Sequence, residues 1–233
     1  MPRYFDFEVT LKHIDPPIWR RFLLTADDTT FMDLHGAIQD ADTWLNMHLW
    51  QFQEEAWRGR VLAQLSPDEE MGIDADDQDA PAADEVALST YFTAEGDRCV
   101  YLYDYGDGWE HEVVLKRIVD KPETFYRRLI DGQRAFPPED CGGPPGYEMC
   151  LALVGSPSAA KVDFSDFDEQ EMEDRREWVG DWDPEEFDLE QAREWFDGDT
   201  RRQVAENQEA ILDELDREMD EIEREWDGRD ASG

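Results

Sequence analysis

The sequence contains little lysine, few cysteines and no long apolar run. Only four of its 22 basic residues are lysine, and its three cysteines, Cys99, Cys141 and Cys150, lack Cys-x-x-Cys spacing. An odd number of cysteines without paired spacing argues against a disulfide framework and against a four-ligand structural zinc site. No apolar run approaches the roughly 18 residues of a membrane span, and the N-terminus lacks a signal pattern. We therefore expect a cytoplasmic protein with no membrane association.

The chain also lacks the short motifs of common nucleotide-binding and hydrolytic sites. It contains no P-loop, Rossmann fingerprint, nucleophile elbow or His-Glu-x-x-His sequence. The sequence therefore assigns no cofactor and does not decide whether the protein is an enzyme.

Acidic residues dominate what is present. Sixty Asp and Glu residues against 22 Lys and Arg residues give a formal net charge of −38. Acid spread along the whole chain is typical of adaptation to high salt, where self-repulsion is screened, so we hypothesise a halophilic source. The same charge argues against general nucleic-acid binding, which depends on basic residues. Two arginine pairs beside aromatic residues, Arg20-Arg21 and Arg127-Arg128, leave accessory DNA binding open as an alternative.

Apolar periodicity predicts an α+β domain. We expect a mixed or antiparallel β-sheet built of hairpins, with helices packed on one face. The predicted strands are residues 4–14, 18–24, 45–53, 86–91 and 99–118. The predicted helices are residues 31–44, 144–154 and 182–196, with a short helical turn over 125–130.

The domain should span residues 1–198. An acidic loop insertion interrupts it at residues 66–85, where Asp, Ala, Pro and Gly dominate. Residues 199–233 form a charged segment in which apolar residues recur at threes, fours and sevens, which predicts an amphipathic helix. This C-terminal helix either covers the domain core or pairs with a protein partner or a second copy.

The segment from Tyr101 to Leu115 predicts a hairpin whose turn fixes the pairing of side chains. If Asp107-Gly108 form a two-residue type I′ turn, Asp104 lies directly opposite His111. Leu102 and Val100 would then oppose Val113 and Leu115 on the same face. A carboxylate and an imidazole would meet at the rim of the core.

Two hypotheses for function follow from this pairing. The first is a non-enzymatic binding module, because aromatic side chains with a few polar groups are typical of recognition surfaces. Its concave face would be walled by the 136–147 loop and lined by Trp50, Tyr103, Trp109, Asp104 and His111.

The second hypothesis is a metal-assisted hydrolase or nuclease, in which His, Asp and Cys side chains supply ligands or acid–base groups. The candidates for these roles are His48, Asp104, Asp107, His111 and Cys141, and a metal, if bound, would use His48, Asp104, His111 and Cys141.

The loop before the 144–154 helix adds two expectations. Cys141 should be partly exposed, with its thiol pKa lowered by the helix N-terminus. The Gly142-Gly143 backbone could offer N–H groups to an anion at the same place.

Four separated motifs resemble those of the plasmid pRiA4b ORF-3-like family. They are Leu34-His-x-x-Ile-Gln39, His48-Leu-x-x-Phe52, Tyr103-Asp-Tyr-Gly-Asp-Gly-Trp-Glu-His111 and Pro137-Pro-Glu-Asp-Cys-Gly-Gly-x-x-Gly-Tyr147. The resemblance covers roughly residues 3 to 196. It implies an α+β domain of bacteria and archaea, often encoded on plasmids and near mobile elements, and it implies no settled activity.

Overall fold

The computed structural model describes residues 1–42, 44–65, 80–159, 161–165 and 167–198. Residues 1–197 form one compact unit. The predicted acidic insertion therefore falls largely outside the described residues, and the predicted C-terminal helix over 199–233 falls entirely outside them. Among the helices that are described, none has both the length and the apolar composition needed to cross a membrane.

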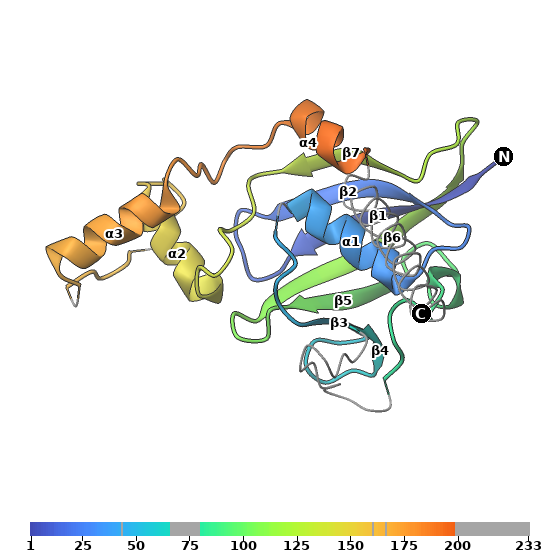
Figure 1. The fold of residues 1–233 in the computed structure, drawn as a ribbon, viewed down its shortest axis with the longest axis horizontal. Coiled ribbons are helices and arrows are strands. Elements are labelled where there is room, and N and C mark those ends of the chain that lie inside the picture. Colours follow the sequence, from blue (N-terminus) through green and yellow to red (C-terminus); the bar gives the residue numbers. More distant parts are fainter. Residues whose placement is uncertain (43, 66–79, 160, 166, 199–233) are drawn as a thin grey trace, which may run out of the picture. The chain divides into compact units, whose positions relative to one another are not determined.

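A seven-stranded sheet forms the centre of the domain, and every neighbouring pair of strands is antiparallel (Figure 1). The strand order is β4-β3-β5-β6-β1-β2-β7. The strands are β1 (Arg3–Leu11), β2 (Ile18–Thr25), β3 (Trp50–Gln53), β4 (Val61–Gln64), β5 (Arg98–Tyr103), β6 (Trp109–Asp120) and β7 (Arg127–Gln133). The helices are α1 (Phe31–Asp42), α2 (Gly143–Leu153), α3 (Glu169–Val179) and α4 (Leu189–Phe196), with a 3-10 turn η1 (Leu88–Thr90). The α+β class and the antiparallel hairpins are confirmed.

The core lies between α1 and the sheet. In β1 the alternating apolar residues Phe5, Phe7, Val9 and Leu11 are all buried. They belong to the same core cluster as Phe31 of α1. β1 and β2 form a hairpin around Pro16 and Pro17, with Leu11 opposite Ile18.

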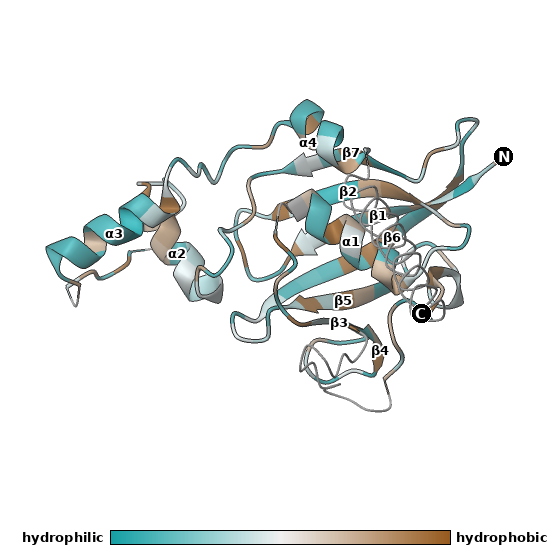
Figure 2. Cartoon of the chain, viewed as in Figure 1, coloured by the Kyte–Doolittle hydropathy of each residue, from teal (hydrophilic) through white to brown (hydrophobic). Residues whose placement is uncertain are grey.

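Figure 2 shows the hydropathy of each residue on the fold. The helix α3 is mostly hydrophilic, and nearly all of its side chains are exposed. Its first turn is closed by a capping box in which Asp168 accepts a hydrogen bond from the Glu171 amide and Glu171 reciprocates. Because α3 has no apolar stripe to give a helical period, the pattern of apolar residues did not predict it.

Three predicted elements have a different structure, each for a local reason. Residues 125–130 were expected to be helical, but residues from Arg127 onward form β7 because they pair with β2. Residues 86–91 contain η1 instead of a strand. The predicted 182–196 helix begins only at Leu189, where the Asp188 carboxylate accepts the amides of Glu190 and Gln191.

Both outer strands of the sheet have hydrogen-bond partners on their outward side. At β4, the Gln64 amide donates to the Pro81 carbonyl, and the Gln64 carbonyl accepts from the Ala83 amide. At β7, the Leu129 amide donates to the Asp197 carboxylate, and Arg193 of α4 donates to the Leu129 and Ile130 carbonyls. Neither edge is therefore a free row of hydrogen-bonding groups.

Candidate functional site

The β5–β6 hairpin has a register different from the predicted one. Tyr103 pairs with Trp109, and Tyr101, in place of Asp104, pairs with His111. The connection is a five-residue loop because the Asp104 carboxylate accepts hydrogen bonds from the Gly106 and Asp107 amides. This side-chain turn replaces the tight Asp-Gly turn, so the Asp104–His111 pairing is wrong.

The new register places His111 inside the core. Its side chain is 0% exposed, and its ring stacks on Phe136 and meets Trp44 edge-on. Complete burial lowers the pKa of His111 to about 3, against a hydrogen bond to the Tyr101 backbone that favours the charged form. His111 is therefore a neutral core residue at physiological pH, away from any open site.

The predicted aromatic recognition face is also absent. Trp50, Tyr103 and Trp109 are each at most 2% exposed. Trp50 stacks on His35 at a ring distance of 3.8 Å, and Tyr103 stacks on Trp44 at 5.0 Å. These side chains stabilise the core and do not line a concave surface.

A different group of ligating side chains gathers near the β5–β6 loop, which lies at the end of the sheet nearest α2 (Figure 1). His48, Asp104 and Asp140 each offer one ligand atom, and these atoms lie within 4.8 Å of one another. The His48 Nε2 atom is 3.0 Å from Asp140 Oδ1, and its Nδ1 atom is 3.7 Å from Asp104 Oδ2. Sequence reasoning named His48 and Asp104 but missed Asp140, the neighbour of Cys141.

Three loops carry these side chains, one each from the α1–β3, β5–β6 and β7–α2 connections. The predicted strand over 45–53 begins only at Trp50, because Asn46 has a φ of 56° and turns the chain. Asp104 and Asp140 also have positive φ values, 53° and 60°. Asp and Asn adopt this left-handed region at lower cost than most residues, and such conformations cluster at functional sites.

Glycines bring two of the loops into contact. The Gly142 amide donates to the Asp107 carboxylate at 3.0 Å. The anion expected at the Gly142-Gly143 backbone is therefore a side chain of the same protein and not an external ligand. A Cβ on Gly143 would lie 2.3 Å from the Asp107 carbonyl oxygen. Only glycine permits this approach, which holds Asp104 and Asp140 on adjoining loops.

Tyr103 and Glu139 fix the third loop. The Tyr103 hydroxyl donates to Glu139 Oε1 at 2.5 Å and accepts the Met47 amide at 3.1 Å. The other Glu139 oxygen accepts the Leu45 amide at 2.7 Å. Burial, followed by the hydrogen bond to Glu139, raises the pKa of Tyr103, so its hydroxyl stays a donor. The backbone that precedes His48 is thereby anchored near Asp140.

The arrangement suits a divalent cation. The two carboxylates face different ring nitrogens of His48, so an ion held by all three side chains requires one of them to turn. Ligand atoms of a tetrahedral ion with bonds of about 2.1 Å lie about 3.4 Å apart, against separations of up to 4.8 Å here. The His48 Nε2 atom is buried and makes no hydrogen bond to any described residue, despite its short distance to Asp140. Glu139 Oε1, 3.9 Å from the same nitrogen, is close enough to support the site.

Cys141 is not part of this cluster. Its thiol pKa is raised, first by a hydrogen bond with the Cys150 thiol and then by burial. The predicted lowering by the helix N-terminus is therefore wrong. Cys99 and Cys150 are buried.

The two arginine pairs are engaged within the fold. Arg20 is buried and donates to the Ala41 carbonyl, while Arg21 makes a bidentate pair with Asp6. Arg127 is buried 2.6 Å from a carboxylate oxygen of Asp40, and Arg128 pairs with a carboxylate on the preceding loop. These contacts leave neither pair as a ready phosphate-binding patch.

Comparison with known proteins shows what the chain as a whole is similar to. Over 150 residues the chain is 37% identical to an uncharacterised protein, y4hQ, of Sinorhizobium fredii (strain NBRC 101917 / NGR234), covering 63% of this chain and 71% of that protein. It also resembles the crystal structure of MM3350, a protein of unknown function from Methanosarcina mazei Go1, with a TM-score of 0.63 and 30% identity over 82% of this chain and 98% of that one. The model of the plasmid pRiA4b ORF-3-like protein family matches residues 3–191. The chain therefore belongs to the plasmid pRiA4b ORF-3-like family.

Proposed function

We propose that the protein binds a divalent metal ion through His48, Asp104 and Asp140 and uses it as a hydrolytic centre. The observation that carries the proposal is the convergence of these three side chains from three separate loops within 4.8 Å. An imidazole with two carboxylates suits Zn²⁺ or Mn²⁺, whereas thiolate-selecting metals are disfavoured because no cysteine joins the cluster.

The number of ligands favours a catalytic role over a purely structural one. Structural zinc sites usually have four protein ligands, while catalytic sites have three and leave a position for water. A bound ion would lower the pKa of that water and supply a nucleophile near neutral pH. Of the functions considered from the sequence, metal-assisted hydrolysis thus fits the observed cluster best.

The proposal is tested on the full-length protein, stripped with chelator and titrated with Zn²⁺ and Mn²⁺ by calorimetry. We expect one ion per chain. At a free metal concentration about 100 times the Kd, binding should stabilise the fold by about 2.7 kcal/mol, which corresponds to a rise in Tm of roughly 5–10 °C. The same samples are assayed for hydrolysis of bis-p-nitrophenyl phosphate and p-nitrophenyl acetate.

Two variants and one control locate the ion. His48→Ala and Asp104→Asn should weaken binding by at least roughly 100-fold, since even partners that only orient a ligand contribute about 10–100-fold. His13→Ala removes an exposed histidine that pairs with Glu110 and should leave binding unchanged. The metal site is refuted if the wild-type protein takes up no ion, or if the His48→Ala variant binds the ion as tightly as the wild type does. Stoichiometric metal without turnover of either substrate refutes the hydrolytic role alone.

A further inference from the structure

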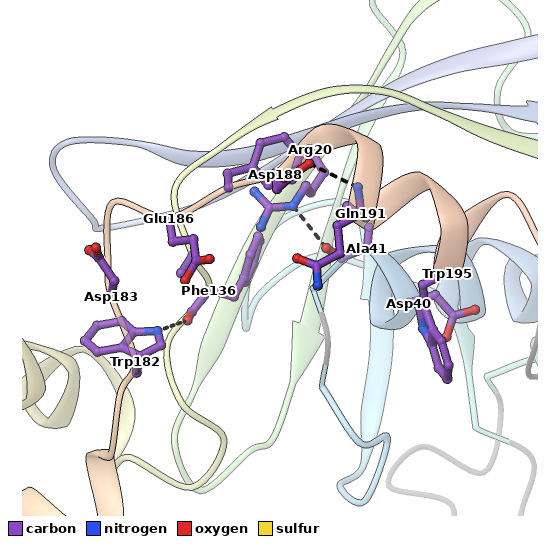
Figure 3. Close-up of a pocket in the computed structure, with 13 residues that line it drawn as sticks. Arg20, Asp40, Ala41, Phe136, Trp182, Asp183, Glu186, Asp188, Gln191 and Trp195 are labelled. Atoms are coloured by element: carbon purple, nitrogen blue, oxygen red, sulfur yellow. Dashed lines mark hydrogen bonds between the residues drawn. The ribbon is translucent and has the colours of Figure 1, made fainter.

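A cavity separate from the cluster of His48, Asp104 and Asp140 lies between the end of α1, the 182–188 segment and α4 (Figure 3). Its volume is about 410 Å³, within the range of pockets that hold small ligands. Figure 3 shows Trp182 at one end, Trp195 at the other and Arg20 between them. None of the residues that line it belongs to the proposed metal site.

Aromatic faces form much of the wall. Trp182, Trp195, Phe136 and Phe187 all line the cavity. Two of these rings already hold a cation, because the Arg20 guanidinium carbon lies 4.8 Å from the Phe136 centroid and 4.2 Å from the Phe187 centroid. Trp195 is 48% exposed, so part of its indole ring is open to solvent. Indole is the best aromatic partner for a cation.

Three carboxylates give the cavity a negative rim. One Asp183 oxygen accepts a hydrogen bond from the Glu185 amide. One Asp188 oxygen accepts hydrogen bonds from amides in the first turn of α4. No ion pair with any described residue involves either of them or Glu186. A fourth lining carboxylate, Asp40, is already engaged with Arg127. The lining thus carries three carboxylates without an ion pair to a described residue, against the one positive charge of Arg20.

We infer that this cavity binds an organic cation on an apolar stem, namely a guanidinium group. A guanidinium plane stacks on indole and phenyl faces while its N–H groups donate to carboxylates. Glu186 and Asp183 supply carboxylate acceptors for these N–H groups, and the Gln191 amide oxygen supplies a neutral acceptor. The same chemistry is found in a free alkylguanidine and in an arginine side chain of a peptide.

The test uses butylguanidine and its uncharged analogue butylurea, which share size and stem. Each is titrated into the ¹⁵N-labelled full-length protein while the nine indole N–H signals are followed. Butylguanidine should shift the Trp182 and Trp195 signals at a concentration at least about tenfold lower than butylurea does, and its affinity should fall as salt is added. A capped Gly-Arg-Gly peptide is titrated in parallel.

Charge and ring variants complete the test. Glu186→Gln should weaken butylguanidine binding by about 3–10-fold and Trp195→Ala by about tenfold, with butylurea unaffected by the first. Glu194→Gln is the matched control, since Glu194 is an exposed carboxylate of α4 that does not line the cavity.

Each outcome has a definite meaning. Tighter binding of the peptide than of butylguanidine supports an arginine of a partner as the occupant, and the reverse supports a small molecule. Equal binding of butylguanidine and butylurea overturns the inference, as do unmoved Trp182 and Trp195 signals or equal effects of Glu186→Gln and Glu194→Gln.

Discussion

Two histidines of this chain illustrate how position decides chemistry at the scale of single residues. His111 is fully enclosed by aromatic rings and stays neutral, whereas His48 is partly open and faces three carboxylates. The same side chain is therefore a packing element in one place and a candidate ligand in the other. Burial, more than residue type, separates these roles.

The low pKa of His111 has a consequence for acid stability. In the unfolded chain a histidine titrates near pH ~6.5, so below that pH the unfolded state binds one proton more than the folded state. Stability should fall by about 1.4 kcal/mol per pH unit from about pH 6.5 down toward the folded pKa of about 3. His111→Phe keeps an aromatic ring in place and should remove this part of the acid sensitivity.

Urea unfolding at pH 7.0, 6.0, 5.0 and 4.5 measures the free energy of unfolding of His111→Phe and of the wild type. The difference between the two proteins isolates His111, because the titration of the many carboxylates is common to both. His13→Gln serves as the exposed control and should follow the wild-type curve. Parallel pH dependences of wild type and His111→Phe would mean that His111 is not held neutral by burial.

At this scale the sequence predicted part of the candidate site. His48 and Asp104 were identified from their residue types and motifs, but the expected partner of Asp104 was His111. The error came from the turn, since the Asp104 side chain competes with the Asp-Gly pair for control of the chain reversal. Asp140 was overlooked because its place beside Asp104 depends on a contact between loops far apart in sequence.

At the scale of elements, the candidate site is a junction of loops fixed by contacts outside the ligands. Gly143 lets the β7–α2 loop approach the β5–β6 loop, and Tyr103 with Glu139 anchors the loop that carries His48. Such support sets ligand positions as firmly as the ligands themselves do.

Gly143→Ala should separate the two loops. The new Cβ would meet backbone atoms of Asp107, and these cannot move aside as a flexible side chain would. We expect metal affinity to fall by roughly 10–100-fold, the range seen when groups that orient a ligand are lost. Calorimetric titration with Zn²⁺ measures the change.

Gly155→Ala is the control for backbone strain. Both glycines have a φ of 68°, but no atom lies within 4 Å of a Cβ at position 155. Its variant should lose stability without losing metal affinity. If the two variants bind Zn²⁺ equally well, the loop contact at Gly143 does not position the ligands.

Elements with a clear apolar period were the most predictable. β1, β2 and α1 were identified because alternating or helical apolar spacing is strong in each of them. β7 was misread because its period of two is short, and its strand conformation depends on pairing with β2. Local propensity does not contain that pairing.

At the scale of the whole molecule, charge is the dominant property. The acidic residues that give the net charge of −38 repel one another in dilute buffer. The screening length falls from about 10 Å at 0.1 M salt to about 3 Å at 1 M. Since compaction brings these charges together, screening should favour the folded state.

We expect Tm to rise as KCl is increased from 0.1 to 2 M, measured by calorimetry at pH 7. Sucrose at matched osmolality controls for effects of the solvent that do not involve charge. A Tm that falls as molar salt is added would rule out adaptation of this surface to high salt.

The occupied margins of the sheet matter most under that same condition. Once salt has removed the mutual repulsion of neighbouring molecules, crowded copies are free to touch. A β-sheet whose outermost strands offered bare amides and carbonyls would then invite strand-by-strand growth into fibres. Here Asp197 and Arg193 at one margin and the backbone of Pro81 and Ala83 at the other use those groups internally. In concentrated salt these hydrogen bonds would therefore oppose association of copies through the sheet margins.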